Sequence, residues 1–125
     1  MNRENLRTTG SRYEQKAAAC LSQMGFRLLD RNFRCRQGEI DLIAMDGETL
    51  VFIEVKYRSS LKNGDPAEAV NKRKQRRIIQ AARYYMLSRG FSEDTPCRFD
   101  VAALWREEGT DGTRFRLIRD AFWGE

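Results

Sequence analysis

Two apolar segments that carry isolated charges constrain the fold of this chain more than any other feature. They are Gly38–Ala44, with the sequence GEIDLIA, and Val51–Lys56, with the sequence VFIEVK. Both have the length and composition of strands, and Asp46-Gly47 between them is a turn signal, so the pair predicts a β-hairpin. Because a charge buried in such strands is costly without a partner, the acids and the lysine point to a binding or catalytic site.

Alternation along the strands decides which charges meet. Glu39 and Asp41 share one face of the first strand, and Glu54 and Lys56 share one face of the second. In a hairpin with an even-numbered loop, opposite residues point to the same face, so these four side chains gather at the end away from the turn. The other face is apolar and consists of Ile40, Leu42, Ala44, Val51, Ile53 and Val55.

Two hairpin registers satisfy this arrangement. A two-residue loop at Asp46-Gly47 places Asp41 opposite Phe52. A four-residue loop from Asp46 to Thr49 places Asp41 opposite Glu54. The sequence leaves both registers open.

Clustered carboxylates favour a metal site. They repel one another, and one takes up a proton unless a cation lies between them. Mg²⁺ accepts one or two carboxylates, keeps several waters and binds phosphate oxygens, so Asp41 and Glu54 are candidate ligands of Mg²⁺ or Mn²⁺ at a phosphodiester-cleaving site. Lys56 would stabilise the attacking water or the developing phosphoryl charge. The alternative is a structural Glu–Lys pair at a solvated strand end, worth about 0.2–1 kcal/mol.

The rest of the chain predicts one α/β or α+β domain over residues 1–125. The expected order is helix, three strands, helix, and one or two strands. Besides the hairpin, the expected elements are a helix over 11–24, a strand over 26–33, a helix over 65–88, and strands over 97–105 and 114–122. Ser59–Gly64 is expected to be a loop, and Asp65 to cap the second helix. As an alternative, Asn71 caps a separate helix after a short first one.

The charge balance favours a polyanionic partner. There are 23 Lys and Arg against 18 Asp and Glu, a net charge of +5. The most concentrated cations are Lys72, Arg73, Lys74, Arg76 and Arg77, with Arg58 at the end of the second hairpin strand. They are candidates for contact with nucleic acid, and the alternative is a solvated helix start.

Composition also bounds the compartment. The three cysteines are widely spaced and there is no histidine, which disfavours a zinc site and a disulfide framework. Reduced thiols and the lack of an apolar run long enough to span a bilayer predict a cytoplasmic protein without a membrane partner.

Several phrases resemble known proteins. Asp41 followed by Glu54-Val55-Lys56 is similar to the D…(D/E)-x-K signature of restriction-endonuclease-like nucleases. The phrases Gly38–Ala44, Val51–Arg58 and Arg98–Val101 resemble the YraN-like family of bacterial proteins, over nearly the whole chain. The resemblance implies a restriction-endonuclease-like αβββαβ core, with a mixed central sheet flanked by helices, as in archaeal Holliday-junction resolvases.

The resemblance also implies roles for individual residues. Asp41 and Glu54 would be metal ligands, with Glu14 of the first helix as an auxiliary catalytic ligand, Val55 as a further ligand position, and Lys56 as the catalytic lysine. Ile40 departs from the proline of the wider superfamily. The implied activity is Mg²⁺- or Mn²⁺-dependent endonuclease cleavage of structured or branched DNA, and the resolvases suggest a homodimer by analogy.

Alternatives to these roles stay open from the sequence. Ser11-x-x-Glu14 also fits a capping box, in which Glu14 only closes the start of a helix. Asp100 is either a further acid near the site or the ion-pair partner of Arg98. For the whole protein, the alternative to a nuclease is a non-catalytic nucleic-acid-binding protein, and a protein-interaction role is a third.

Overall fold

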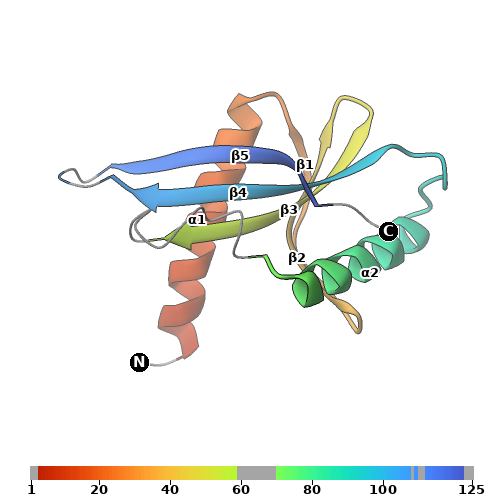
Figure 1. Cartoon of the computed structure of the whole chain (residues 1–125), viewed down its shortest axis with the longest axis horizontal. Helices are drawn as coiled ribbons and strands as arrows, with labels where there is room; N and C mark the ends of the chain where they lie inside the picture. Colours follow the sequence, from red (N-terminus) through yellow and green to blue (C-terminus); the bar gives the residue numbers. More distant parts are fainter. Residues whose placement is uncertain (1–2, 59–69, 108, 110–111, 123–125) are drawn as a thin grey trace.

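The chain folds into a five-stranded sheet with helices packed against it (Figure 1). This computed structural model describes residues 3–58, 70–107, 109 and 112–122, with side chains from residue 12 onward. The elements in chain order are α1 (Arg3–Gln23), β1 (Arg27–Cys35), β2 (Gly38–Asp46), β3 (Thr49–Arg58), α2 (Lys72–Ser88), β4 (Cys97–Arg106) and β5 (Thr113–Phe122). The strands neighbour one another in this same order. The pair β3 and β4 is parallel and the other neighbouring pairs are antiparallel, which confirms the predicted α/β class with a mixed sheet.

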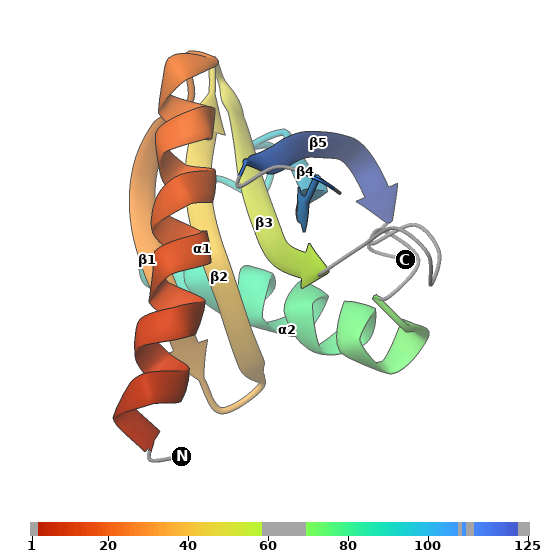
Figure 2. The same cartoon turned by 90° about the vertical axis from the view of Figure 1, so that its left-hand side faces the viewer.

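Each face of the sheet is covered by one helix. In Figure 2, α1 lies in front of β1 and β2, while α2 passes behind β2. The cluster on the α1 face contains Ala17, Ala18, Leu21, Phe26, Leu42, Ala44, Val51, Ile53, Ala102 and Leu104. The cluster on the α2 face includes Ile40, Ile43, Leu50, Phe52, Ile78, Ala81, Ala82, Tyr85, Phe99 and Val101. The central strands are therefore buried on both faces, which explains why they read as nearly continuous apolar runs.

The predicted apolar face of the hairpin is present with one correction. Every predicted member except Ile40 packs within or against the α1-face cluster, whereas Ile40 belongs to the α2-face cluster. Alternation therefore breaks between Ile40 and Leu42, at Asp41. The neighbouring strand is also irregular here, because Asn32 lies across from Asp41 and has a left-handed φ of 52°. This local distortion overrides the strict period of two on which the prediction rested.

The second helix begins at the alternative cap. Asn71 has an extended backbone, and its side-chain oxygen accepts a hydrogen bond of 2.9 Å from the Lys74 backbone N–H. Asparagine is favoured at this position because it satisfies an N–H that the first turn leaves free. The prediction that Asn71 caps a helix is confirmed, while Ser59–Gly64 and the predicted start at Asp65 lie outside the described residues.

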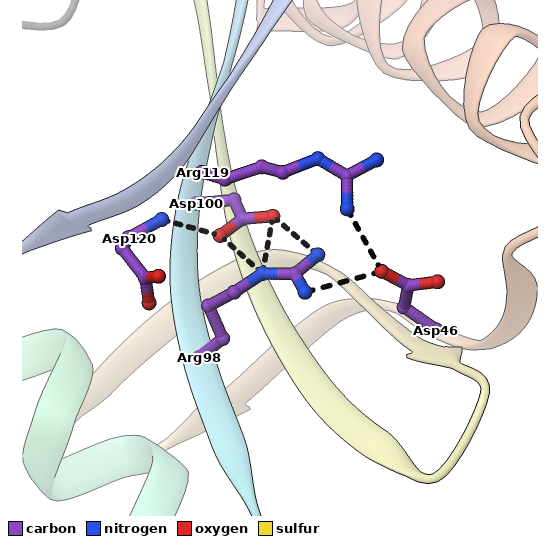
Figure 3. A network of polar contacts seen from close by, with 5 residues as sticks. All are labelled: Asp46, Arg98, Asp100, Arg119 and Asp120. Carbon is purple, nitrogen blue, oxygen red and sulfur yellow. Dashed lines mark hydrogen bonds and ion pairs between the residues drawn. The ribbon is translucent and has the colours of Figure 1, made fainter.

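A buried polar network joins the tip of the β2–β3 hairpin to β4 and β5 (Figure 3). Asp100 is 0% exposed, and Arg98 donates to both of its carboxylate oxygens at 3.0–3.1 Å. The backbone N–H of Asp120 donates to the same carboxylate at 3.1 Å. Arg98 and Arg119 both reach Asp46, at 3.1 and 3.0 Å. Of the two alternatives for Asp100, the ion pair with Arg98 is therefore confirmed.

Candidate functional site

The hairpin register places Asp41 beside Glu54. Pairing between β2 and β3 ends with Leu42 opposite Ile53, so the acids are the next residues along each strand. This is the register predicted for the four-residue loop from Asp46 to Thr49. The alternative register, with Asp41 opposite Phe52, is wrong.

The turn itself differs from both predicted loops. Asp46 pairs with Thr49, so the loop consists of Gly47 and Glu48 alone. Gly47 has a φ of 61°, and glycine is favoured at the first position of such a two-residue loop because it adopts a positive φ without strain. The glycine therefore sets the register by taking the first loop position rather than the second.

Asp41 is a partly buried carboxyl in an unfavourable charge environment. Its Oδ2 atom accepts a hydrogen bond of 2.8 Å from the backbone N–H of Val55. Burial raises the pKa of Asp41 to about 7, and the negative charges of Glu54 and Glu14 add to the rise. The Val55 N–H and the positive charge of Lys74 oppose it. Near neutral pH, the Asp41 carboxyl can therefore either hold a proton or, when charged, bind a cation.

Glu54 is held between two lysines. Its side chain is 6% exposed, and its Oε1 atom lies 2.6 Å from Lys74 Nζ and 3.7 Å from Lys56 Nζ. Burial lowers the pKa of Lys56, and a hydrogen bond and positive charge from Lys74 lower it further, against the opposing charge of Glu54. Of the four predicted neighbours, Asp41, Glu54 and Lys56 thus meet at one end of the hairpin, with Lys74 added. Glu39, the fourth, is exposed and pairs with Arg34.

Lys74 is the site residue whose position the sequence reasoning missed. The sequence predicts Lys74 to be one of the exposed cations of α2, but the structure places its ammonium against Glu54. Burial lowers the pKa of Lys74, but the hydrogen bond and charge of Glu54 outweigh this, so the net direction is upward. A signal was present, because Lys74 precedes the buried Ile78 by one helical turn and so lies on the face that α2 turns toward the sheet.

Glu14 lies within α1 rather than at its start. The helix begins at Arg3, so Ser11 is an interior residue and the capping-box alternative is wrong. Burial raises the pKa of Glu14, a hydrogen bond with Asn32 lowers it, and the charges of Glu39 and Glu54 raise it. Across the part of the chain that the structure describes, no three Asp, Glu, His or Cys side chains form a metal-binding group, so Glu14 joins the site through its charge in this geometry.

The predicted nucleic-acid contacts are mostly at the surface. Lys72, Arg73, Arg76 and Arg77 are exposed on the first turns of α2, and Arg58 is exposed at the end of β3. The first turns of α2 pass close to the acidic pair, because Lys74 in the same run contacts Glu54. The exposed cations at the start of α2 therefore lie close to Asp41 and Glu54.

The raised pKa of Asp41 predicts a pH dependence of stability. A carboxyl whose pKa is higher in the folded protein binds more protons when folded, so the free energy of unfolding falls as the pH rises from about 4 to about 7. The Asp41→Asn variant should lack this contribution. Its stability relative to the wild type should therefore be greater at about pH 8 than at about pH 5, as urea unfolding at both pH values would measure. A stability difference that is the same at both pH values would contradict the shift.

Comparison with known sequences assigns the chain to a family. The family model described as "Uncharacterised protein family UPF0102" matches residues 13–104, which include Asp41, Glu54 and Lys56. A UPF0102 protein of Lachnoclostridium phytofermentans is 47% identical over 118 residues, covering 94% of this chain and 95% of that protein. One of Symbiobacterium thermophilum is 50% identical over 117 residues, covering 93% and 97%. One of Nitrosococcus oceani is 45% identical over 116 residues, covering 93% and 92%.

Within the described residues, no helix combines the length and the apolar character needed to cross a bilayer. The family match covers most of the chain, and the relatives align along nearly their whole length. The chain therefore belongs to the UPF0102, or YraN-like, family.

Proposed function

We propose that this protein is a Mg²⁺- or Mn²⁺-dependent endonuclease that hydrolyses phosphodiester bonds in structured or branched DNA. The observation that carries the proposal is the pairing of Asp41 with the buried Glu54 at one strand end, with Lys56 and Lys74 against them. Acids and lysines in this arrangement suit a reaction in which a water attacks a phosphate and negative charge develops on its oxygens.

The order of the helices and strands also supports the proposed nuclease function. The order α1, β1, β2, β3, α2, β4 is the αβββαβ order that the resemblance to restriction-endonuclease-like nucleases implies. The acids lie on the two central hairpin strands, and Lys56 follows Glu54 by two residues. A chance D…E-x-K match in sequence would not require its three members to meet at one strand end.

The acids fit a divalent cation. Burial, followed by the charge of Glu54, raises the pKa of Asp41, so a nearby cation would favour its charged form, and Mg²⁺ needs no more than one or two carboxylates because it retains waters. Asp41 and Glu54 would hold the ion, with the backbone of Val55 and the auxiliary Glu14 as further ligand positions. A bound ion would supply an acidified water and charge neutralisation.

The chain's own groups would do the remaining work. Lys56 is half-buried beside Glu54, where its ammonium would hold the attacking water or a phosphate oxygen. The Val55 N–H fixes the Asp41 carboxylate, so its orientation does not depend on solvent. The exposed cations of α2 would bind the phosphates of the strand that carries the scissile bond.

A non-catalytic nucleic-acid-binding function is the second candidate, and one observation favours it. Lys74 already lies 2.6 Å from Glu54, so part of the acidic charge is neutralised without any metal. Such a protein would bind DNA with a strong salt dependence but would not cleave it.

A panel of labelled linear, flapped and four-way DNA, with Mg²⁺ or Mn²⁺, separates the two functions. We expect metal-dependent cleavage by the wild type, none with EDTA, and none by Glu54→Gln. A filter-binding assay on the same variant should show that it still binds DNA. Binding without cleavage by the wild type on every substrate would replace the nuclease with the binding protein.

A further inference from the structure

A pocket of about 650 Å³ lies between the β1–β2 turn and the first turns of α2. Its charged lining is dominated by cations, and the lining residues that matter here are Arg34, Gly38, Glu39, Arg73, Lys74 and Arg77. We call this site the basic pocket. Among the described residues that line it, Glu39 is the one acid.

The wall of the basic pocket is built by a close approach of backbone to backbone. A Cβ atom on Gly38 would lie 3.0 Å from the backbone oxygen of Arg77, so a larger residue would force the turn and the helix apart. The Arg77 side chain also donates across the same gap, with Nε 3.5 Å from the Gln37 oxygen. The turn and α2 are thus held together at the rim of the pocket.

The cations of the basic pocket exceed the local acids. Arg34 pairs with Glu39 at 3.3 Å, and Lys74 pairs with Glu54. Within the described residues, no carboxylate pairs with Arg73 or Arg77, although both side chains line the pocket. The pocket also adjoins the start of α2, where the helix dipole favours an anion. The ligand chemistry that fits is therefore an anion with several hydrogen-bond acceptors.

The basic pocket and the acidic pair share one side chain. Lys74 lines the pocket and also contacts Glu54, so a ligand in the pocket is adjacent to the candidate cleavage site. We propose that the basic pocket binds a phosphate group of the nucleic-acid strand next to the scissile bond. The nature of the ligand as a nucleic-acid strand rests on the proposed function, while its anionic character rests on the pocket alone. Guanidinium groups match phosphate oxygens through paired hydrogen bonds, which makes Arg73 and Arg77 the expected contacts.

Two kinds of phosphate share this chemistry, namely a terminal phosphate of a strand and a phosphate inside it. The test uses fluorescein-labelled DNA strands of one sequence with a 5′-phosphate, with a 5′-hydroxyl, or closed into a circle. Binding is measured by anisotropy in EDTA over a series of salt concentrations. If replacing Arg73 and Arg77 weakens binding of the 5′-phosphorylated strand alone, the pocket binds a terminal phosphate. If it weakens binding of all three strands, the pocket binds an internal phosphate. Either result supports the pocket.

Matched variants separate the pocket from general charge. The double variant Arg73→Gln, Arg77→Gln removes the two pocket arginines that pair with no carboxylate of the described residues. Its control, Lys16→Gln, Arg27→Gln, removes two exposed cations of α1 and β1 that do not line the pocket. We expect the pocket variant to bind about tenfold more weakly, with a salt slope reduced by about 1.4, and the control to change by no more than about threefold. Glu39→Gln should act in the opposite direction and strengthen binding, because it removes the acid of the lining.

The outcomes distinguish this inference from the proposed function. Equal weakening by the pocket and control variants would overturn the pocket, as would a wild type that binds none of the strands. Because EDTA removes metal, pocket-dependent binding stands even if no substrate is ever cleaved, and only the nuclease proposal then fails. If the wild type cleaves DNA but replacing Arg73 and Arg77 leaves its DNA binding unchanged, the proposal for the basic pocket alone is wrong.

Discussion

Replacing Asp41 with asparagine is expected to lower DNA cleavage by roughly a hundred- to a thousandfold. Asparagine has nearly the same shape, and its oxygen still accepts the hydrogen bond from the Val55 N–H, so the fold should be retained. The negative charge that would hold a divalent ion beside Glu54 is lost. Initial cleavage rates on the best substrate of the panel, at saturating metal, measure the effect.

The control for Asp41→Asn is Glu48→Gln. It makes the same change of charge in the exposed loop at the far end of the same hairpin, away from the acidic pair. We expect its cleavage rate to match the wild type. If Asp41→Asn cleaves as fast as Glu48→Gln does, Asp41 has no part in the chemistry and the proposed site is wrong.

Replacing Arg98 with methionine is expected to lower the free energy of unfolding by about 3–5 kcal/mol. Asp100 is 0% exposed, and Arg98 supplies its bidentate ion pair, so the variant leaves a buried carboxylate whose one remaining donor, within the described residues, is the Asp120 N–H (Figure 3). An unpaired charge in this position is far more costly than a lost surface pair. Urea unfolding at neutral pH gives the measurement.

Arg119 provides the matched control for this stability effect. It also reaches Asp46, at 3.0 Å, but its side chain is 50% exposed and the Asp100 contacts belong to Arg98. Arg119→Met should therefore cost no more than about 1 kcal/mol. Adding Asp100→Asn to the Arg98→Met variant should recover part of the loss, because the buried charge is then gone. Equal losses for the two arginines would show that burial of Asp100 is not the cause.

The sequence predicted the features that depend on local pattern. The turn signal at Asp46-Gly47 and the approximate alternation of the strands predicted that Asp41, Glu54 and Lys56 meet at one end of a hairpin. The order of helices and strands followed from periodicity, and Asn71 was recognised as a possible cap from its residue type alone. These features can be predicted from the sequence because they depend on residues that are close together along the chain.

The features that the sequence did not settle depend on contacts between distant segments. Strict alternation placed Ile40 with Leu42, but the irregular neighbouring strand at Asn32 moved it to the other face. The sequence pattern predicts Lys74 to be a surface cation of α2, whereas the packing of α2 against the sheet brings its ammonium into contact with Glu54. The choice between loops also required the observed pairing of Asp46 with Thr49.

The position of Lys74 makes the two candidate ligands interdependent. A single ammonium both neutralises Glu54 and lines the basic pocket. A phosphate that draws it into the pocket would expose the carboxylate to a metal, and a metal on Glu54 would release the ammonium toward a phosphate. Thermodynamic linkage requires each ligand to raise the affinity of the other by the same factor. Metal would then load most tightly when a strand is already bound, which would tie the assembly of a cleaving centre to the presence of its substrate.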